Sequence, residues 1–233
     1  MPYFGTNKSK ARTMNQVICT VDVVLLTIRE EALMVAVIAR EQDPFKGRLA
    51  LPGGYIHADQ DHSAYDAAVR VIQDKAAIVP PYLEQLSTFS GPARDPRGWS
   101  VSIAHYALVP FDLVYRADNQ VKLIKVDSKL SLPFDHDTMV QKAVERLSNK
   151  SQYSSLPCFL AGDEFTLPQL QRIYEVLMGE PVNKVTFRRK IGEMDMLEPV
   201  EGGFEAAGAH RPAQLYRLKP AFRQRLMLLE RGM

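Results

Sequence analysis

The chain has 233 residues, of which 46% are hydrophobic, and it carries a formal net charge of +2 at pH 7. This length and apolar content suffice for one medium domain and a smaller one, and the small net charge excludes a polycation. No uninterrupted apolar run of about 18 residues occurs, and the first residues lack the apolar core and cleavage site of a signal peptide. We therefore expect a cytoplasmic protein that does not enter a membrane.

The two cysteines, Cys19 and Cys158, lie far apart in the sequence, in apolar or mixed surroundings. In such surroundings cysteine is more often a reduced packing residue than half of a disulfide, a metal ligand or a nucleophile. We expect both to be packing residues, and the pair by itself builds no metal cluster.

Residues 16–150 alternate strand-like and helical patterns and predict a first domain, a mixed α/β sheet sandwiched by helices. The expected elements, in chain order, are a strand hairpin at 17–28 and 32–40, a glycine turn at 53–54, a helix at 64–75, strands at 86–90 and 101–109, and a helix at 136–150. Met139, Ala143 and Leu147 share one face of the last helix, which closes the domain.

Two short segments flank this domain. Residues 1–15 form a basic N-terminal arm that contains Lys8, Lys10 and Arg12. Residues 148–157 are polar, rich in serine and end in a proline, a composition typical of a linker. We therefore place the connection between the domains at 151–160.

Residues 161–233 predict a second domain that begins with a helix at 165–179. Thr166 fits the N-cap of this helix, Pro168 its first turn and Gly179 its C-cap. Its apolar stripe consists of Leu170, Ile173, Val176 and Leu177.

A second helix, at 183–197, has one apolar and one basic face. Its apolar positions are Phe187, Ile191 and Met194. A hairpin with glycines and a strand at 213–218 follow, and this is the element order of a winged helix-turn-helix.

The basic residues of this domain are candidate contacts to double-stranded DNA. A basic run is often only a solvated face, but here it lies on the second helix of a helix pair and beside a hairpin tip, which favours phosphate and base contacts. The candidates are Lys184, Thr186, Arg188, Arg189, Lys190, His210 and Arg211. Thr186 is equally well explained as a residue that caps the helix start.

The glycine turn at 53–54 and the helix after it resemble the Nudix box, which runs from a glycine through a glutamate to an Arg-Glu pair and two further glutamates. Aligned on Arg70, the three helical glutamates fall on Val71, Asp74 and Lys75. The alternative is an ordinary helix of an α/β core, and the LPGGYI turn argues against it.

The altered box predicts that hydrolase chemistry is lost. The earlier glutamate of the box falls on Gln60 or His62 and its terminal glycine on Ala77. In Nudix hydrolases the glutamates converge on magnesium, which activates the attacking water. Val71 offers no ligand and Lys75 places a positive charge where the metal lies, so we expect no metal and no catalytic residue.

Over residues 17–220 the chain resembles the NrtR family, Nudix-related transcriptional regulators that join a degenerate Nudix domain to a winged helix-turn-helix and control genes of NAD metabolism. The stretches that carry the resemblance are 45–56, 78–90, 93–109, 132–140, 165–179, 186–191 and 211–220. The resemblance implies an α+β protein, in which a Nudix-like α/β/α sandwich with a mixed sheet precedes the DNA-binding domain.

Residues 94–99, RDPRGW, are similar to a segment of ADP-ribose pyrophosphatases, which implies a site for ADP-ribose or a relative of NAD. A diphosphate needs fixed cations and backbone donors, and adenine needs a flat partner. The candidate ligand-binding residues are Phe45, Gly53, Gly54, Arg94, Arg97, Trp99, Tyr106 and His136. For Phe45, Trp99 and Tyr106 a core position is the alternative, and His136 either caps its helix or faces the site.

Together these patterns predict a homodimeric repressor that binds a palindromic operator and senses an ADP-ribose-type effector, with no required cofactor. One alternative is an ADP-ribose or NAD-type pyrophosphatase with an unusual metal site. Another is a DNA-binding protein whose Nudix-like part serves only dimerisation. The sequence leaves open which metabolite is the effector and whether it releases or strengthens DNA binding.

Overall fold

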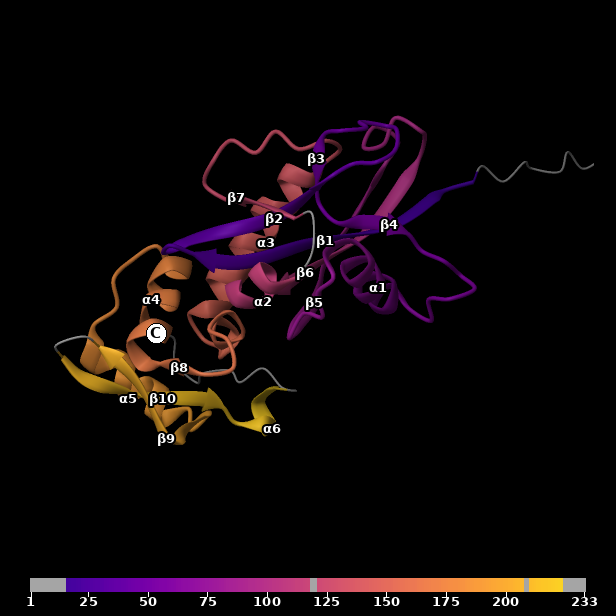
Figure 1. Cartoon of the computed structure of the whole chain (residues 1–233). Helices are drawn as coiled ribbons and strands as arrows, with labels where there is room; N and C mark the ends of the chain where they lie inside the picture. Colours follow the sequence, from indigo (N-terminus) through magenta and orange to yellow (C-terminus); the bar gives the residue numbers. More distant parts are fainter. Residues whose placement is uncertain (1–15, 118–120, 208–209, 224–233) are drawn as a thin grey trace, which may run out of the picture.

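The computed structural model describes residues 16–117, 121–207 and 210–223. Its elements are β1 (Ile18–Arg29), β2 (Ala32–Ala39), β3 (Leu49–Ala50), β4 (Gly53–Tyr55), α1 (Ala64–Ala76), β5 (Tyr82–Gly91), β6 (Ser100–Leu108), α2 (Phe111–Arg116), β7 (Lys122–Lys125), α3 (His136–Ser151), η1 (Leu156–Leu160), β8 (Phe165–Thr166), α4 (Leu167–Met178), α5 (Lys184–Glu193), β9 (Leu197–Ala207), β10 (His210–Leu218) and α6 (Pro220–Arg223). In Figure 1, α4, α5 and the small sheet lie together at the turn between β1 and β2.

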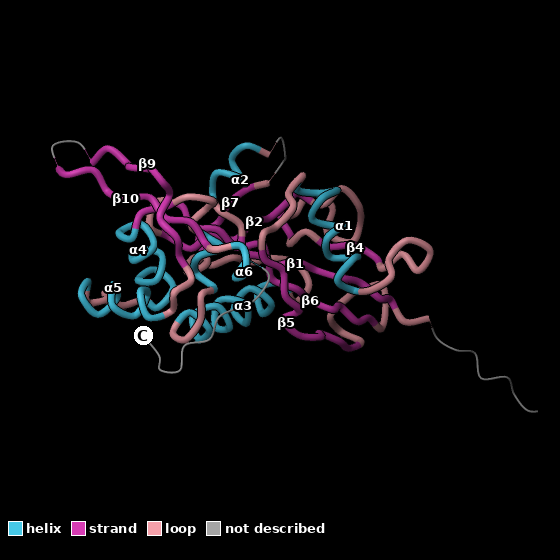
Figure 2. The backbone as a smooth tube through the Cα atoms, turned by 90° about the horizontal axis from the view of Figure 1, so that it is seen from below, coloured by secondary structure: helices cyan, strands magenta, loops and turns pink. Residues whose placement is uncertain are grey.

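The large sheet is mixed, as predicted. Its strands follow the order β3-β2-β1-β6-β5, with β4 added to β1 and β7 to β2. The β1–β6 pair is parallel, and the other pairs of this sheet are antiparallel. Because successive side chains of a strand point to opposite faces, Val23 and Leu25 of β1 pack toward α1 and α2, whereas Val24 and Leu26 pack toward α3. Figure 2 shows the sheet between these helices, so the α/β/α sandwich is confirmed.

The small sheet and two helices form the expected winged helix-turn-helix. Thr166 and Gln169 make a reciprocal capping box at the start of α4, and Gly179 ends the helix with φ 73°. Helix α5 ends at Glu193, earlier than predicted, because β9 already begins at Leu197. Strands β9 and β10 form the wing that projects in Figure 2, with β8 as the third strand of the sheet. The apolar stripe of α4 also differs from the expectation, since Tyr174 is fully buried and Val176 only partly.

The segment predicted as a polar linker is instead packed into the core. Helix α3 continues to Ser151, and all five residues of η1 are buried. The serines misled because they bond locally: the Ser151 hydroxyl donates to the Leu147 carbonyl at 2.7 Å and the Ser154 hydroxyl to the Lys150 carbonyl at 2.7 Å. Most of the segment 151–160 is therefore buried, and the domain boundaries remain a prediction.

One hydrophobic cluster extends from the large sheet through η1 into α4 and α5. The Tyr174 hydroxyl of α4 donates to the Ser154 carbonyl at 3.0 Å, and the rings of Tyr82 and Phe159 lie 5.0 Å apart. Both cysteines are free, and burial raises the pKa of Cys158 to about 12, as fits a packing residue. In the described ranges, no helix combines the length and the apolar composition that a membrane span needs.

Candidate functional sites: a cationic cavity and a basic helix

A cavity of about 620 Å³ opens beside β1, β2 and β4, with the end of α1 and the start of α3 on its walls. This volume lies within the usual range for small-molecule sites. Five of the predicted ligand-binding residues line it, namely Gly53, Gly54, Arg94, Arg97 and His136. Asp22, Arg40, Tyr55, Lys75, Asp95 and Phe134 also line it and were not predicted as ligand-binding residues.

Asp22 of β1 forms the floor of this cavity. Its carboxylate accepts from the Ser102 hydroxyl at 2.6 Å, and Nε2 of His136 lies 3.4 Å away. Burial by itself raises the pKa of Asp22, but His136, Ser102 and Arg94 together lower it below its usual value, so Asp22 is a fixed negative charge.

The glycines predicted to form a turn at 53–54 lie instead in strand β4, where the close approach of Asp22 requires them. Gly53 pairs with Asp22, and a Cβ atom at Gly53 would lie 1.9 Å from the Asp22 Oδ1 atom. A Cβ atom at Gly54 would lie 3.2 Å from a methyl group of Val71. The two glycines therefore allow β1, β4 and α1 to approach one another closely.

Gly53→Ala is expected to lower the free energy of unfolding by about 1–3 kcal/mol, the usual cost of overpacking, because Asp22 must move away from the new methyl group. Urea denaturation followed by circular dichroism measures this change. Gly192→Ala is the control for a methyl group added in open space, since no described residue lies within 4 Å of a Cβ atom there, and it is expected to keep or raise the stability because alanine favours a helix. Equal stability of Gly53→Ala and the wild type would show that β4 tolerates a side chain.

His136 faces the cavity and does not cap α3, whose N-cap is Asp135. Its Nδ1 accepts from the backbone N–H of Leu51 at 3.1 Å, which places the ring proton on Nε2, toward Asp22. The two alternatives left open by the sequence are thereby resolved in favour of the cavity.

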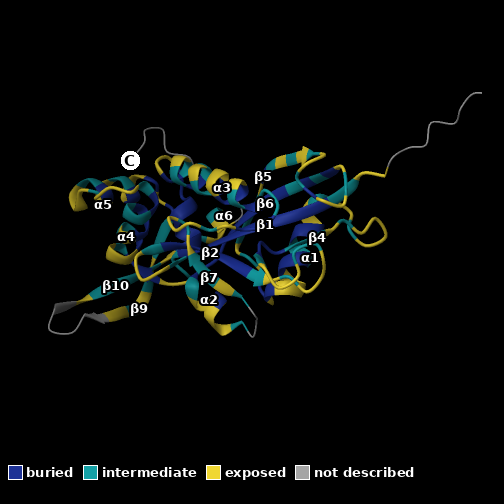
Figure 3. Ribbon diagram, turned by 90° about the horizontal axis from the view of Figure 1, so that it is seen from above, coloured by how far each residue is buried: buried dark blue, intermediate teal, exposed yellow. Residues whose placement is uncertain are grey.

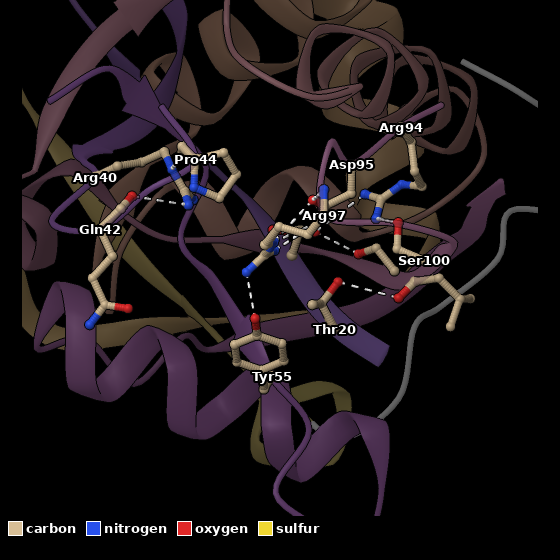
Figure 4. A network of polar contacts seen from close by, with 12 residues as sticks. Thr20, Arg40, Gln42, Pro44, Tyr55, Arg94, Asp95, Arg97 and Ser100 are labelled. Atoms are coloured by element: carbon tan, nitrogen blue, oxygen red, sulfur yellow. Dashed lines mark hydrogen bonds and ion pairs between the residues drawn. The ribbon is translucent and has the colours of Figure 1, made fainter. Parts of the chain in front are cut away.

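The two predicted arginines are held by carboxylates. Arg94 makes a bidentate pair with Asp135, at 3.0 and 2.9 Å, and its side chain is only 8% exposed. Arg97 pairs with the buried Asp95 at 2.6 Å and donates to the Tyr55 hydroxyl (Figure 4). Their charges are therefore largely neutralised inside the protein.

Arg40 and Lys75 are the cavity cations that sequence reasoning missed. Arg40 donates to the carbonyls of Pro44 at 2.7 Å and Gln42 at 3.4 Å, and Lys75 donates to the carbonyl of Gly53. Within the described ranges, neither has a carboxylate oxygen within 4.0 Å. Burial is the main cause that lowers the pKa of both groups, and the charge of Asp22 partly opposes this lowering.

The three positions of α1 that align with the helical glutamates of the Nudix box lie partly in the core and partly at the cavity. Val71 is 2% exposed and packs on Val21, whereas Asp74 and Lys75 line the cavity. Ala77 has φ 52°, the left-handed conformation expected where the family has glycine. Among the described residues, no three His, Cys, Asp or Glu side chains are arranged to hold a metal ion.

The carboxylate that binds the arginine of the box is Asp61, which lies between Gln60 and His62 in the sequence. Arg70 donates to both carboxylate oxygens of Asp61, at 2.8 and 2.7 Å, and to the carbonyl of Tyr55 at 3.0 Å. These hydrogen bonds hold the pKa of Asp61 well below its usual range.

The three predicted aromatic residues do not line the cavity. Tyr106 is fully buried and donates to Glu84 at 3.2 Å, within the core. Trp99 is 46% exposed, so it is not a core anchor either. Phe45 contacts Phe134, which does line the cavity, and the centroids of the two rings lie 5.0 Å apart.

Helix α5 has exposed positions on the surface of the winged helix (Figure 3). Lys184, Arg188 and Arg189 are exposed, and Thr186 and Lys190 are half-buried. The Asn183 side chain accepts from the backbone of Thr186 at 3.1 Å, so Asn183 is the cap and Thr186 is not. The side chains of His210 and Arg211 lie outside the residues that the structure describes.

This fold defines a class of protein, a degenerate Nudix domain joined to a winged helix-turn-helix. Residues 157–218 match the model of the NrtR DNA-binding winged helix domain. The chain is 37% identical over 203 residues to the ADPR-responsive transcriptional repressor of Acinetobacter baylyi. The aligned region covers 85% of this chain and 80% of that protein.

Two solved structures of NrtR from Shewanella oneidensis are similar to this chain. The protein in complex with a 27mer DNA superposes with a TM-score of 0.84 at 36% identity, over 92% of this chain and 99% of that one. Its Nudix domain in complex with ADP-ribose gives a TM-score of 0.54 at 34% identity, over 60% of this chain and 94% of that one. The chain belongs to the NrtR family.

Proposed function

We propose that this protein is a cytoplasmic transcriptional repressor of genes of NAD biosynthesis or salvage, which binds operator DNA through α5 and the wing and senses ADP-ribose or a related metabolite in the cavity. The observation that carries the proposal is the pair Arg40 and Lys75, two cations on the walls of a ligand-sized cavity that form no ion pair within 4.0 Å with any described carboxylate. The relatives named above, a repressor responsive to ADPR and a regulator bound to DNA, support both halves.

A diphosphate fits this charge distribution. Arg94 and Arg97 already neutralise Asp135 and Asp95, so the positive charge available to an anion comes from Arg40 and Lys75. Charge-assisted hydrogen bonds to phosphate are stronger than neutral ones and gain further when water is excluded. Tyr55 and Phe134 supply aromatic surface in the same cavity for a base or a ribose.

Lys75→Met is expected to weaken ADP-ribose binding by about tenfold, since a hydrogen bond to a charged group contributes about 1.5 kcal/mol or more. Isothermal titration calorimetry measures the dissociation constant. Lys142→Met, on α3, removes an equal charge that donates to the Ser87 hydroxyl of β5 and does not line the cavity, and it serves as the control. Unchanged affinity in Lys75→Met would remove this cation from the effector site and contradict the proposed cavity chemistry.

We further propose that the protein has no hydrolase activity. Val71 and Lys75 replace two carboxylates of the box, and the ammonium group of Lys75 binds the Gly53 carbonyl at the cavity. Purified protein with magnesium or manganese is therefore expected to leave ADP-ribose intact, as followed by chromatography of the nucleotides. Turnover above about one per second, an ordinary enzymatic rate, would favour the pyrophosphatase alternative.

The operator is expected to be palindromic and the protein a homodimer. One winged helix covers a single half-site, whereas two copies related by a two-fold axis read an inverted repeat and add their contacts. The structure of the relative from Shewanella oneidensis holds a 27mer DNA, a length that accommodates two half-sites one helical turn apart.

A further inference from the structure

Helix α5 has an outward face whose composition the fold does not explain. Phe187 and Ile191 are buried against the rest of the domain. Positions 185, 188, 189, 192 and 193 lie away from this buried side, because residues three, four and seven apart share one side of a helix. This outward face, called here the α5 face, therefore consists of Val185, Arg188, Arg189, Gly192 and Glu193, of which Glu193 pairs with Arg189.

Two members of the α5 face, Val185 and Gly192, have a lower helix propensity than alanine. Val185 is 75% exposed, and a β-branched residue is less favourable in a helix than alanine. Gly192 is less favourable still, yet it lacks a positive φ, and a Cβ atom there would meet nothing within 4 Å. Single exposed apolar residues are ordinary on protein surfaces, but two helix-disfavouring residues on one face, beside two arginines, indicate a constraint from outside the chain.

The position and the side chain of Val185 suit a contact to a base in the major groove of DNA. Val185 lies in the first turn of α5, and its backbone N–H donates to the Asn183 side chain at 3.0 Å, which fixes its position. Residues at the start of a recognition helix contact base edges, and the 5-methyl group of thymine is the apolar feature of the major groove. A stiff, apolar side chain such as valine is suited to that methyl group and not to a phosphate.

We propose that Val185 is a specificity-determining residue that contacts the 5-methyl group of a thymine in each operator half-site, while Gly192 lets the α5 face lie close to the DNA. This inference rests on the proposed DNA binding. It assigns to the α5 face a preference for one base, which the arginines alone do not supply.

The first experiment removes the methyl group from the DNA. An operator is selected from random-sequence duplexes with the full-length protein, and each thymine is then replaced singly by deoxyuridine. One replacement per half-site is expected to weaken binding about fourfold, which corresponds to about 0.8 kcal/mol for one buried methyl-sized group. Failure to select any sequence would contradict DNA recognition itself, whereas a selected operator that tolerates every replacement would overturn only the role of Val185.

The second experiment combines this change with a change of the protein. Val185→Ala is expected to bind the thymine operator several-fold more weakly and to lose its discrimination between thymine and deoxyuridine at that position. Val79→Ala, at an exposed valine outside the winged helix, is the matched control and is expected to retain full discrimination. Full discrimination in Val185→Ala would assign the methyl contact to another residue.

The third experiment separates stability from binding. Gly192→Ala is expected to raise the melting temperature, because alanine favours the helix, and yet to weaken operator binding about fivefold or more, because the new methyl group meets the DNA. Asn149→Ala, at an exposed position near the end of α3, is the control for a stabilising helix substitution. Unchanged operator affinity in Gly192→Ala would show that the DNA does not approach this residue.

Discussion

Arg188→Ala is expected to weaken operator binding by about 1–3 kcal/mol for each half-site, and therefore by twice that amount in a dimer on a palindrome. Arg188 is exposed and, in the part of the chain that the structure describes, has no ion-pair partner. Arg189 lies 2.6 Å from Glu193, four residues along the same helix, so its charge is already shared. Arg189→Ala is therefore expected to cost less than Arg188→Ala.

Fluorescence anisotropy with the selected operator, at several salt concentrations, distinguishes the two possible roles of Arg188. A contact to a base relaxes specificity at one position, whereas a contact to a phosphate weakens binding to all sequences and reduces the salt dependence by about one counterion. Arg116→Ala, at an exposed arginine of α2, is the control. Equal affinity of Arg188→Ala and the wild type would place a different element in the groove.

The winged helix was predictable because its signals are local. Each signal acts within one or two turns of a helix: the Thr166 hydroxyl caps α4, Gly179 ends it in the left-handed conformation, and the buried Phe187 and Ile191 are spaced four residues apart. The burial of the segment 151–160 was not predictable from composition, because it depends on side chains of α4 and on Tyr82, which meet this segment only in the folded chain. The polar composition indicated a linker, whereas the hydroxyls of Ser151 and Ser154 bond to carbonyls of α3.

The cavity was predicted in part for a similar reason. The Gly53–Gly54 pair was found because a glycine pair before a helix is a strong local pattern. Arg94 was predicted as a cation for a diphosphate, and nothing near it in sequence reveals its pair with Asp135, 41 residues away. Arg40 belongs to no recognisable motif and directly follows a strand. Lys75 was interpreted only as a residue that replaces a metal-binding glutamate.

The cavity and the DNA-binding domain are physically connected by α3. His136 and Asp135 lie at its start and contact the floor and the wall of the cavity. Its last turns pack into the hydrophobic cluster that also contains α4, and the Ser154 carbonyl just beyond them accepts from Tyr174. We therefore expect that a ligand which favours one position of α3 also favours one position of the winged helix packed on it.

Operator DNA is expected to change the affinity for ADP-ribose by the same factor by which ADP-ribose changes the affinity for operator. A ligand shifts an equilibrium only by its differential affinity for the two states, and coupling of about 1–3 kcal/mol, typical of allosteric proteins, corresponds to about 5–150-fold. Calorimetry of ADP-ribose binding to the free and to the operator-bound protein measures one side of this cycle, and anisotropy with and without ADP-ribose measures the other. Lys75→Met is expected to shift the ADP-ribose concentration required without changing operator affinity in its absence. If ADP-ribose binds both forms equally well, it is not the signal, and the Nudix-like domain is then a dimerisation scaffold.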